Sequence, residues 1–252
     1  MELILFGRKY VLTMSSNKGP RSDNQDYVGW AHYGNERAEG SIGVHSTDNP
    51  ETFVAIVCDG MGGLENGSRI SNAVCNELVQ NVAKEHYADI DEYLVKLKSI
   101  LIRVEDSIRV NLPNSGTTIV AAVAVDDKWC IMHLGDSRAY HKKYEWKRTL
   151  DHSPVESLLS NGLIDEDEAL FHPMRNIVSK YIGGGYAGEI EIEPIEPGEE
   201  IVLCSDGAFG YMMPNEFINL ITCDKNAEDI VQKALSNGGK DNTTVLCIIP
   251  KS

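Results

Sequence analysis

The feature that most constrains this chain is an unbroken apolar run that ends at an aspartate and a glycine-rich turn. Residues 53–58 read F-V-A-I-V-C, Asp59 follows, and the chain continues as G-M-G-G. A short β-branched run of this length is typical of a strand buried on both faces. A carboxylate at its end is costly unless its charge is compensated. The stretch therefore indicates either an acidic turn or a cation held by Asp59 and by the main-chain carbonyl of Gly60.

The same pattern occurs three more times in the chain. Asp136 and Asp206 each follow an apolar run, and Asp241 stands just before the run at residues 243–249. An antiparallel arrangement would bring these strand ends to one rim of a sheet. Clustered carboxylates repel one another unless cations bind, and hard oxygen ligands suit Mg²⁺ or Mn²⁺. The repetition therefore favours a divalent metal site over an isolated acidic turn.

Composition excludes several classes of partner. The 252 residues include 38 acidic and 23 basic side chains, for a formal net charge of -15. A chain this acidic is poorly suited to nucleic acid or to an anionic membrane, and we expect neither partner. Its six cysteines form no C-x-x-C pair, which indicates reduced thiols. The chain shows neither a signal peptide nor a membrane-spanning run, and we expect it to be cytoplasmic.

The order of the expected elements indicates the fold class. Strands come first, two long helices follow, and further strands precede two last helices, with no linker between them. Such segregation is typical of an α+β protein rather than an alternating α/β one. The expected strands are residues 9–14, 27–33, 53–58, 116–125, 128–135, 138–146, 189–195, 201–205 and 243–249. The expected helices are residues 67–85, 91–110, 214–221 and 227–236, with a helical insert at 151–183 and a loop at 34–50.

Seven short motifs, taken together, resemble one family in its own order. The chain is similar to the metal-dependent protein serine/threonine phosphatases of the PPM or type 2C family, in their bacterial form. The region around residues 152–186 looks like that family's flap. The motifs are Arg21-x-x-Asn24-Gln25-Asp26, Asp59-Gly-Met-Gly-Gly63, Ser115-Gly-Thr-Thr118, Gly135-Asp-Ser-Arg-Ala-Tyr140, Asp151-His-Ser153, Ser205-Asp-Gly207 and Asp241-Asn-Thr-Thr244.

The resemblance implies a fold and a domain organisation. It implies a four-layer α-β-β-α sandwich, in which two antiparallel β-sheets are flanked by pairs of helices and a helical flap is inserted. Residues 1–252 would form a single catalytic domain.

The resemblance also implies a site with two Mn²⁺ or Mg²⁺ ions. Asp59 would bridge both ions, the Gly60 carbonyl would bind one of them, and Asp206 and Asp241 would bind the other. Whether Asp136 joins Asp206 in a third, weaker metal site is left open.

Further residues would surround the ions. The resemblance implies that Asp26 hydrogen-bonds a metal-bound water and that Arg21 binds the substrate phosphate, so that Arg21, Asp26 and Asp59 form the catalytic set. Gln25 and Asn242 would lie around the ions without binding them directly.

The implied activity is hydrolysis of phosphoserine and phosphothreonine by direct attack of a metal-bridging water. Arginine suits the phosphate because it offers two parallel donors, and two ions can both activate water and orient the displacement. The substrates would be phosphoproteins made by a Ser/Thr kinase, and the enzyme would be a monomer. Two alternatives are a non-catalytic binding module with the same fold, and a phosphatase dedicated to one regulator phosphoprotein or to small phosphoesters.

Three positions depart from the family pattern. Met61 stands where animal members have a histidine, so the proton donor to the leaving group is unassigned. Gln25 replaces a frequent glutamate, which puts a water-mediated metal contact in doubt. Gly210 replaces a frequent aspartate and leaves the third metal site less well furnished.

Other noticeable residues have structural interpretations. His133 lies inside an apolar run and is interpreted as a hydrogen-bonded core histidine. His152 is interpreted as structural, at the start of a helix. Residues 183–188 fit G-x-G-x-x-G but precede a strand pattern, which favours a flexible loop at the end of the flap over a dinucleotide site.

Overall fold

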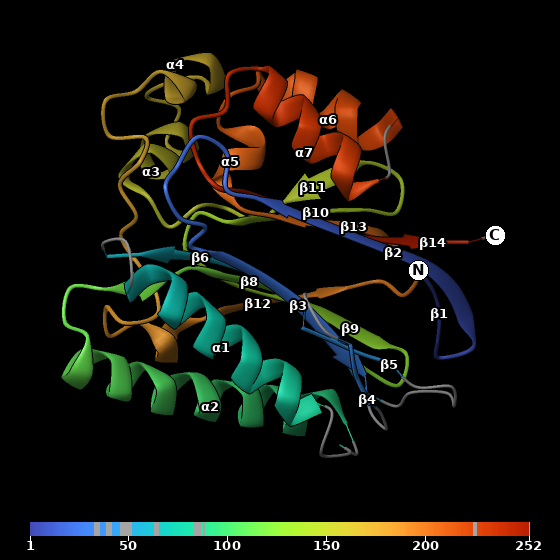
Figure 1. The fold of residues 1–252 in the computed structure, drawn as a ribbon. Coiled ribbons are helices and arrows are strands. Elements are labelled where there is room, and N and C mark those ends of the chain that lie inside the picture. Colours follow the sequence, from blue (N-terminus) through green and yellow to red (C-terminus); the bar gives the residue numbers. More distant parts are fainter. Residues whose placement is uncertain are drawn as a thin grey trace.

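Two β-sheets pack face to face, and helices cover the outer face of each sheet. The computed structural model describes residues 1–32, 36–38, 42–45, 52–62, 66–82, 87, 89–223 and 226–251. Its layers follow the order α-β-β-α (Figure 1). The predicted α+β sandwich with helices on both sides is confirmed by this arrangement.

One sheet has six strands in the order β1-β2-β14-β13-β10-β11, and each neighbouring pair is antiparallel. Its two long central strands come from opposite ends of the sequence: β2, near the N-terminus, pairs with β14, near the C-terminus, with Asn17 opposite Thr243. The strands are β1 (Glu2–Leu5), β2 (Arg8–Asn17), β10 (Arg138–Lys142), β11 (Trp146–Arg148), β13 (Glu200–Cys204) and β14 (Thr243–Pro250).

The second sheet has the order β12-β9-β8-β6-β3-β5-β4, and the short β7 pairs with β6. All pairs are antiparallel except β3 with β5, which is parallel. The strands are β3 (Asp26–His32), β4 (Glu36–Ala38), β5 (Ile42–His45), β6 (Thr52–Met61), β7 (Gly116–Thr117), β8 (Ile119–Val125), β9 (Lys128–Leu134) and β12 (Glu191–Ile195). Strands β4 and β5 fall where a loop was expected, and the remaining residues of that stretch lie outside the described ones.

The apolar pattern of each element fits its place in these layers. The central strand β6 is buried from Thr52 to Cys58, as the uninterrupted run predicts. The layer between the sheets includes Phe53, Trp129 and Leu246, all buried.

Helices α1 (Asn66–Val82) and α2 (Ile90–Asn111) cover the second sheet (Figure 1). The side chains expected to form their apolar stripes are buried there, apart from the partly buried Val104. The described part of α1 ends at Val82, and the expected residues 83–85 lie outside the described ones. On the first sheet lie α5 (Asp206–Phe209), α6 (Pro214–Cys223) and α7 (Ala227–Ser236).

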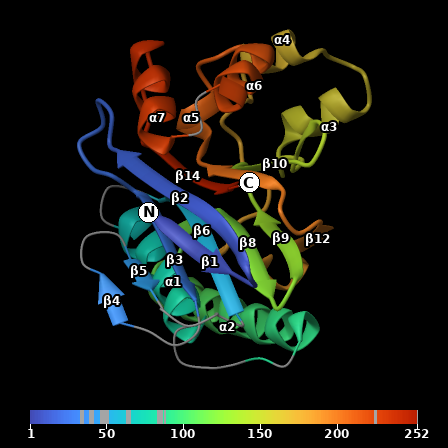
Figure 2. The ribbon, with the colours of Figure 1, turned by 90° about the vertical axis from the view of Figure 1, so that its right-hand side faces the viewer.

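The insert contains less helix than expected. Only α3 (Pro154–Ser160) and α4 (Glu166–Leu170) are α-helical, and each begins at a side-chain cap, Ser153 and Asp165. Both helices lie beside α5 and α6, as Figures 1 and 2 show from two directions. The N- and C-termini lie at the opposite end of the sandwich (Figure 1).

Three further details differ from the sequence prediction. Strand β1 was not expected, and the strand expected at 138–146 is two strands, β10 and β11, joined by a turn. Helix α5, which starts at Asp206, was not expected either. Within the part of the chain that is described, no helix is long and apolar enough to span a membrane.

Candidate metal centre

Strands β3 and β6 place two of the predicted carboxylates opposite each other. Asp26 is the register partner of Asp59 across the antiparallel pair. The Ser205 hydroxyl donates to Asp26 Oδ2 at 2.7 Å, and Asp26 Oδ1 is buried with no hydrogen-bond partner among the described residues. A buried acceptor of this kind calls for a donor or an ion.

Strands β13 and β14 bring the other two predicted metal ligands to the same rim. Asp206 directly follows Ser205 at the end of β13, and Asp241 stands shortly before Thr243, where β14 begins. Ser205 joins these ends, because its amide donates to the Thr244 carbonyl and its hydroxyl accepts from the Thr244 amide, both at 3.0 Å. The antiparallel pairing of β13 with β14 therefore places Asp206 and Asp241 at one rim of the sheet, as the sequence predicts.

Glycine allows the backbone to approach closely at this rim. A Cβ on Gly60 would lie 2.3 Å from the Gly67 carbonyl oxygen and 2.7 Å from that of Gln25. A Cβ on Gly207 would lie 2.0 Å from the Asn242 carbonyl oxygen. A side chain at Gly60 would displace the backbone of α1 or of Gln25, and one at Gly207 would displace the backbone at Asn242.

The carboxylates strongly perturb one another. Burial, and then the charges of Asp26, Asp206, Asp136 and Asp241, raise the pKa of Asp59 well above its ordinary value. Burial, and then the charges of nearby aspartates, raise the pKa of Asp206 well above its ordinary value. These aspartates are Asp136, Asp241, Asp26 and Asp151.

Asp26 and Asp136 show the same effect more mildly. Burial raises the pKa of Asp26 to about 6, although hydrogen bonds from Ser205 and Thr244 oppose this shift. Burial, and then Asp151, raise the pKa of Asp136 to about 7. A cluster of this kind stays ionised at neutral pH only beside positive charge, and its all-oxygen donor set fits Mg²⁺ or Mn²⁺. The residues present therefore fit the implied ions.

The aspartates are spread rather than gathered around one point. Among the described residues, only His133, His152 and Glu191 bring three ligand atoms within 4.8 Å of one another. A pair of ions roughly 3.5–4 Å apart needs ligands distributed over both ions, which agrees with the wider spacing of the aspartates.

Arg21 lies at the edge of this cluster, on one of the predicted ligands. Its Nη2 pairs with Asp241 Oδ2 at 2.6 Å, and its Nε donates to the Lys240 carbonyl at 3.0 Å. The side chain is half-exposed, so its guanidinium has access to solvent and to a substrate.

Asn242 and Gln25 hold the segment that carries Arg21. The Asn242 side chain donates to the carbonyls of Lys18 and Asp23, both at 2.9 Å, and accepts from the Gln25 amide at 2.8 Å. The Gln25 carbonyl accepts from the Gly60 amide at 3.1 Å and from the Ser71 hydroxyl at 2.5 Å. Both predicted residues therefore contact the site through its backbone. The role of Ser71 was not anticipated, because nothing in α1 marks it.

Asp136 does not form the ion pair with Arg138 that an isolated hairpin would offer. Arg138 instead binds Asp151 in a bidentate pair at 2.7 and 2.8 Å, and its guanidinium lies 3.9 Å from the centre of the Phe209 ring. The opposing Asp151 charge raises the pKa of Arg138 further. Asp151 was noticed only as part of a motif.

A cleft of about 310 Å³ extends from the carboxylates beneath the insert. It begins at Asp136, Asp206 and Asp241 and is bounded by α3, α4 and α6. Its walls include the basic side chains Arg138, Lys147, Arg148 and Arg175 and the aromatic side chains Tyr140, Trp146, Phe209, Tyr211 and Phe217. The cleft therefore offers apolar surface next to the rim, together with basic side chains of which Arg138 is paired with Asp151 and Arg148 with Glu156.

Known proteins resemble this chain in sequence and in fold. A family model described as Protein phosphatase 2C matches residues 31–238. Serine/threonine phosphatase stp of Listeria innocua is 31% identical over 236 residues, which cover 83% of this chain and 92% of the relative.

Solved structures share the fold. The S. agalactiae serine/threonine phosphatase has a TM-score of 0.78 at 24% identity, and the match covers 96% of this chain and 100% of that one. The catalytic domain of the serine threonine protein phosphatase PstP, solved in complex with 2 manganese ions, has a TM-score of 0.75 at 23% identity and covers 96% of this chain and 99% of that one. The chain belongs to the protein phosphatase 2C family, that is, to the metal-dependent Ser/Thr protein phosphatases.

Proposed function

We propose that Asp59, the Gly60 carbonyl, Asp206 and Asp241 hold two Mn²⁺ or Mg²⁺ ions with which this phosphatase hydrolyses phosphoserine and phosphothreonine in proteins. The observation that carries the proposal is the set of mutually perturbing carboxylates at one rim of the sandwich. The two manganese ions of PstP support the same stoichiometry here. A third, weaker ion at Asp136 and Asp206 fits the same cluster.

The protein's own residues have separable tasks in this proposal. When bound, the ions would supply Lewis acidity that lowers the pKa of a water and offsets the charge of the phosphoryl group. Asp26, held by Ser205 opposite Asp59, orients that water. Arg21 moves its planar donor pair from Asp241 to the phosphate oxygens. Because water attacks the phosphorus directly, no side chain becomes phosphorylated.

The cleft suits a phosphoprotein segment better than a small phosphoester. Its aromatic and apolar wall continues beyond the carboxylates, which leaves surface for residues that flank the phosphate. The non-catalytic alternative is disfavoured because Asp59, Asp206 and Asp241 are all present at the rim. We further propose a single monomeric catalytic domain, residues 1–252, that acts in the cytoplasm on products of a Ser/Thr kinase.

The test is metal-dependent hydrolysis of p-nitrophenyl phosphate and of a phosphothreonine peptide. We expect activity with Mn²⁺, none after chelation, and a loss of at least a hundredfold in Asp206→Asn. Asp229→Asn, at an exposed position on α7, is the matched control. An inactive wild type, or full activity in Asp206→Asn, would refute the proposal.

A further inference from the structure

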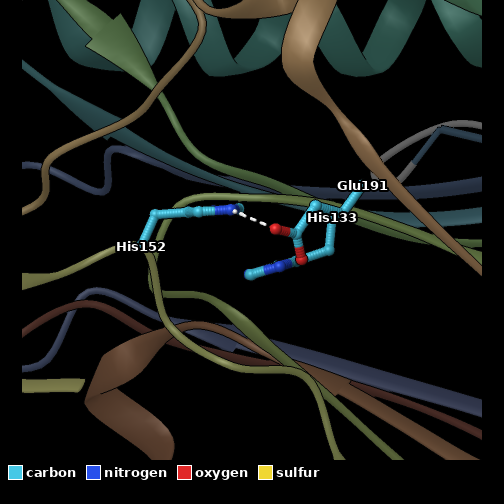
Figure 3. Close-up of side chains that lie close together, drawn as sticks. All are labelled: His133, His152 and Glu191. Atoms are coloured by element: carbon cyan, nitrogen blue, oxygen red, sulfur yellow. Dashed lines mark ion pairs between the residues drawn. The ribbon is translucent and has the colours of Figure 1, made fainter. Parts of the chain in front are cut away.

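We propose that His133, His152 and Glu191 form a second metal site, selective for Zn²⁺ over the ions of the carboxylate centre. The three side chains come from different parts of the chain: His133 from β9, His152 from the segment before α3, and Glu191 from β12. Figure 3 shows the two imidazoles nearly parallel, with the Glu191 carboxylate beside them. Their ring centroids are 4.9 Å apart with 13° between the planes, so one ring must tilt to direct both nitrogens at one ion. Two imidazole nitrogens and one carboxylate are a donor set that zinc accepts, with water as a fourth ligand.

One of the three distances between ligand atoms already suits a tetrahedral site. The three ligand atoms lie within 4.8 Å of one another, and His152 Nε2 lies 3.1 Å from Glu191 Oε1. Zinc–ligand bonds of about 2.0–2.2 Å place tetrahedral ligands roughly 3.4 Å apart. His133 and Glu191 are register partners in the β9–β12 pair, so the strand pairing keeps them side by side. The exposed Glu191 side chain is free to rotate and complete the site.

His133 provides an independent indication that a ligand is needed. The residue is 1% exposed, and neither ring nitrogen has a hydrogen-bond partner within the described part of the chain. Burial, and then His152, lower the pKa of His133 to about 4, against weaker opposing effects of Asp151, Glu191 and the Ser137 backbone. The ring is therefore neutral at pH 7 and has a free lone pair. A buried donor and acceptor left unpaired are destabilising, and a bound ion would remove part of that cost.

Metal binding at His152 changes a hydrogen bond next to the carboxylate centre. The Gly135 amide donates to His152 Nδ1 at 3.0 Å, so the neutral ring carries its proton on Nε2, the atom that lies 3.1 Å from Glu191 Oε1. Zinc takes the place of that proton, and the neutral ring must then carry its proton on Nδ1, facing the Gly135 amide. The bond to Gly135 is thereby lost. Because Gly135 immediately precedes Asp136, occupation of the histidine site is coupled to the turn that carries Asp136.

A path for the ion exists. A cleft of about 170 Å³ borders the site, and its charged and imidazole lining side chains are His133, Arg148, Glu191 and Glu193. Arg148 is paired with Glu156 at 3.0 Å, which limits its repulsion of a cation. The cleft leaves room for the water that completes the zinc coordination.

The test uses the whole protein with the carboxylate centre saturated by Mg²⁺. Co²⁺ serves as a probe for Zn²⁺, because four-coordinate Co²⁺ with nitrogen ligands absorbs visible light far more strongly than six-coordinate Co²⁺ with oxygen ligands. We expect one equivalent of Co²⁺ to produce this band, one equivalent of Zn²⁺ to remove it, and Asp206→Asn to retain it. Glu191→Gln and His133→Asn should weaken Zn²⁺ binding at least tenfold in calorimetric titrations.

Glu193→Gln is the matched control, since Glu193 lies two residues along β12 and borders the same cleft. Its Zn²⁺ affinity should equal that of the wild type. Glu191 is exposed, so Glu191→Gln keeps the test valid even if His133→Asn fails to fold. A wild type without the Co²⁺ band, or equal Zn²⁺ affinity in wild type and Glu191→Gln, would overturn the proposal and leave a purely structural His152–Glu191 contact.

Discussion

Glu105 holds the end of the flap against helix α2, and its removal is the sharpest test of how that segment is anchored. Its carboxylate is buried and accepts four backbone N–H groups. Oε1 accepts from Gly183 at 2.8 Å, Gly185 at 2.9 Å and Tyr186 at 3.1 Å, and Oε2 accepts from Ala187 at 2.9 Å. We predict that Glu105→Ala destabilises the protein and loosens this loop.

The magnitude follows from the number of bonds and their surroundings. A hydrogen bond to a charged group contributes about 1.5–3 kcal/mol, and such contributions are not additive. The loop amides at Gly183 and Gly185 have some access to water, whereas that of Ala187 is buried. We therefore expect Glu105→Ala to lower the free energy of unfolding by about 2–4 kcal/mol, which corresponds to roughly 4–16 °C in Tm. Glu105→Gln keeps Oε1 but turns an amide toward Ala187, and should cost about 1–3 kcal/mol.

Urea unfolding followed by circular dichroism measures the stability change, and hydrogen exchange at residues 183–187 measures the local change. Asp106→Asn, at the next and exposed position of α2, is the control and should change neither. Unchanged exchange in Glu105→Ala, or a stability loss no larger than that of Asp106→Asn, would refute the reasoning.

Three further predictions concern the rim. Arg21→Ala should raise KM about tenfold and lower kcat less if Arg21 binds the substrate phosphate as proposed; steady-state kinetics showing mainly a kcat loss would contradict this. Gly60→Ala should cost more than about 3 kcal/mol in chemical unfolding, since its Cβ would meet backbone at 2.3 Å, whereas Gly188→Ala, with open space around it, should cost little. The raised pKa of Asp136, about 7, means that this group stabilises the metal-free protein below about pH 4 and that the contribution is lost as the pH rises to about 7. The Tm of protein stripped of metal by a chelator should therefore fall between pH 5 and pH 7.5, and added Mn²⁺ should restore it at pH 7.5. A Tm that does not change over this pH range would show that the pKa of Asp136 is not raised.

The sequence was informative wherever periodicity and strand ends determine position. The apolar spacing in α1 and α2 predicted their buried faces, because a helix repeats every 3.6 residues. Aspartates at the ends of apolar runs predicted the rim, because antiparallel pairing leaves few other places for them. Arg21, Gln25 and Asn242 lie at that rim as well, although their chemical roles remain predictions.

Contacts between distant segments could not be predicted in the same way. Glu105 looks like any helical acid, and its partners lie 78 to 82 residues further along the chain. The loop at 183–188 was expected to be flexible for this reason, yet four hydrogen bonds hold it. Likewise, His133 was expected to be hydrogen-bonded in the core, but neither ring nitrogen has a partner of good geometry among the described residues, and Glu191 of β12 and His152 lie beside it.

The position of the chain ends has a practical consequence. Lys251 forms an ion pair with Glu2, and its amide donates to the Lys9 carbonyl of β2, so both ends lie close together on either side of β2 and far from the flap. A short linker between them would give a circular permutant, and new ends could then be opened at an exposed turn such as Gly162. Attachment to a biosensor surface through either original end would leave the catalytic cleft facing the solution.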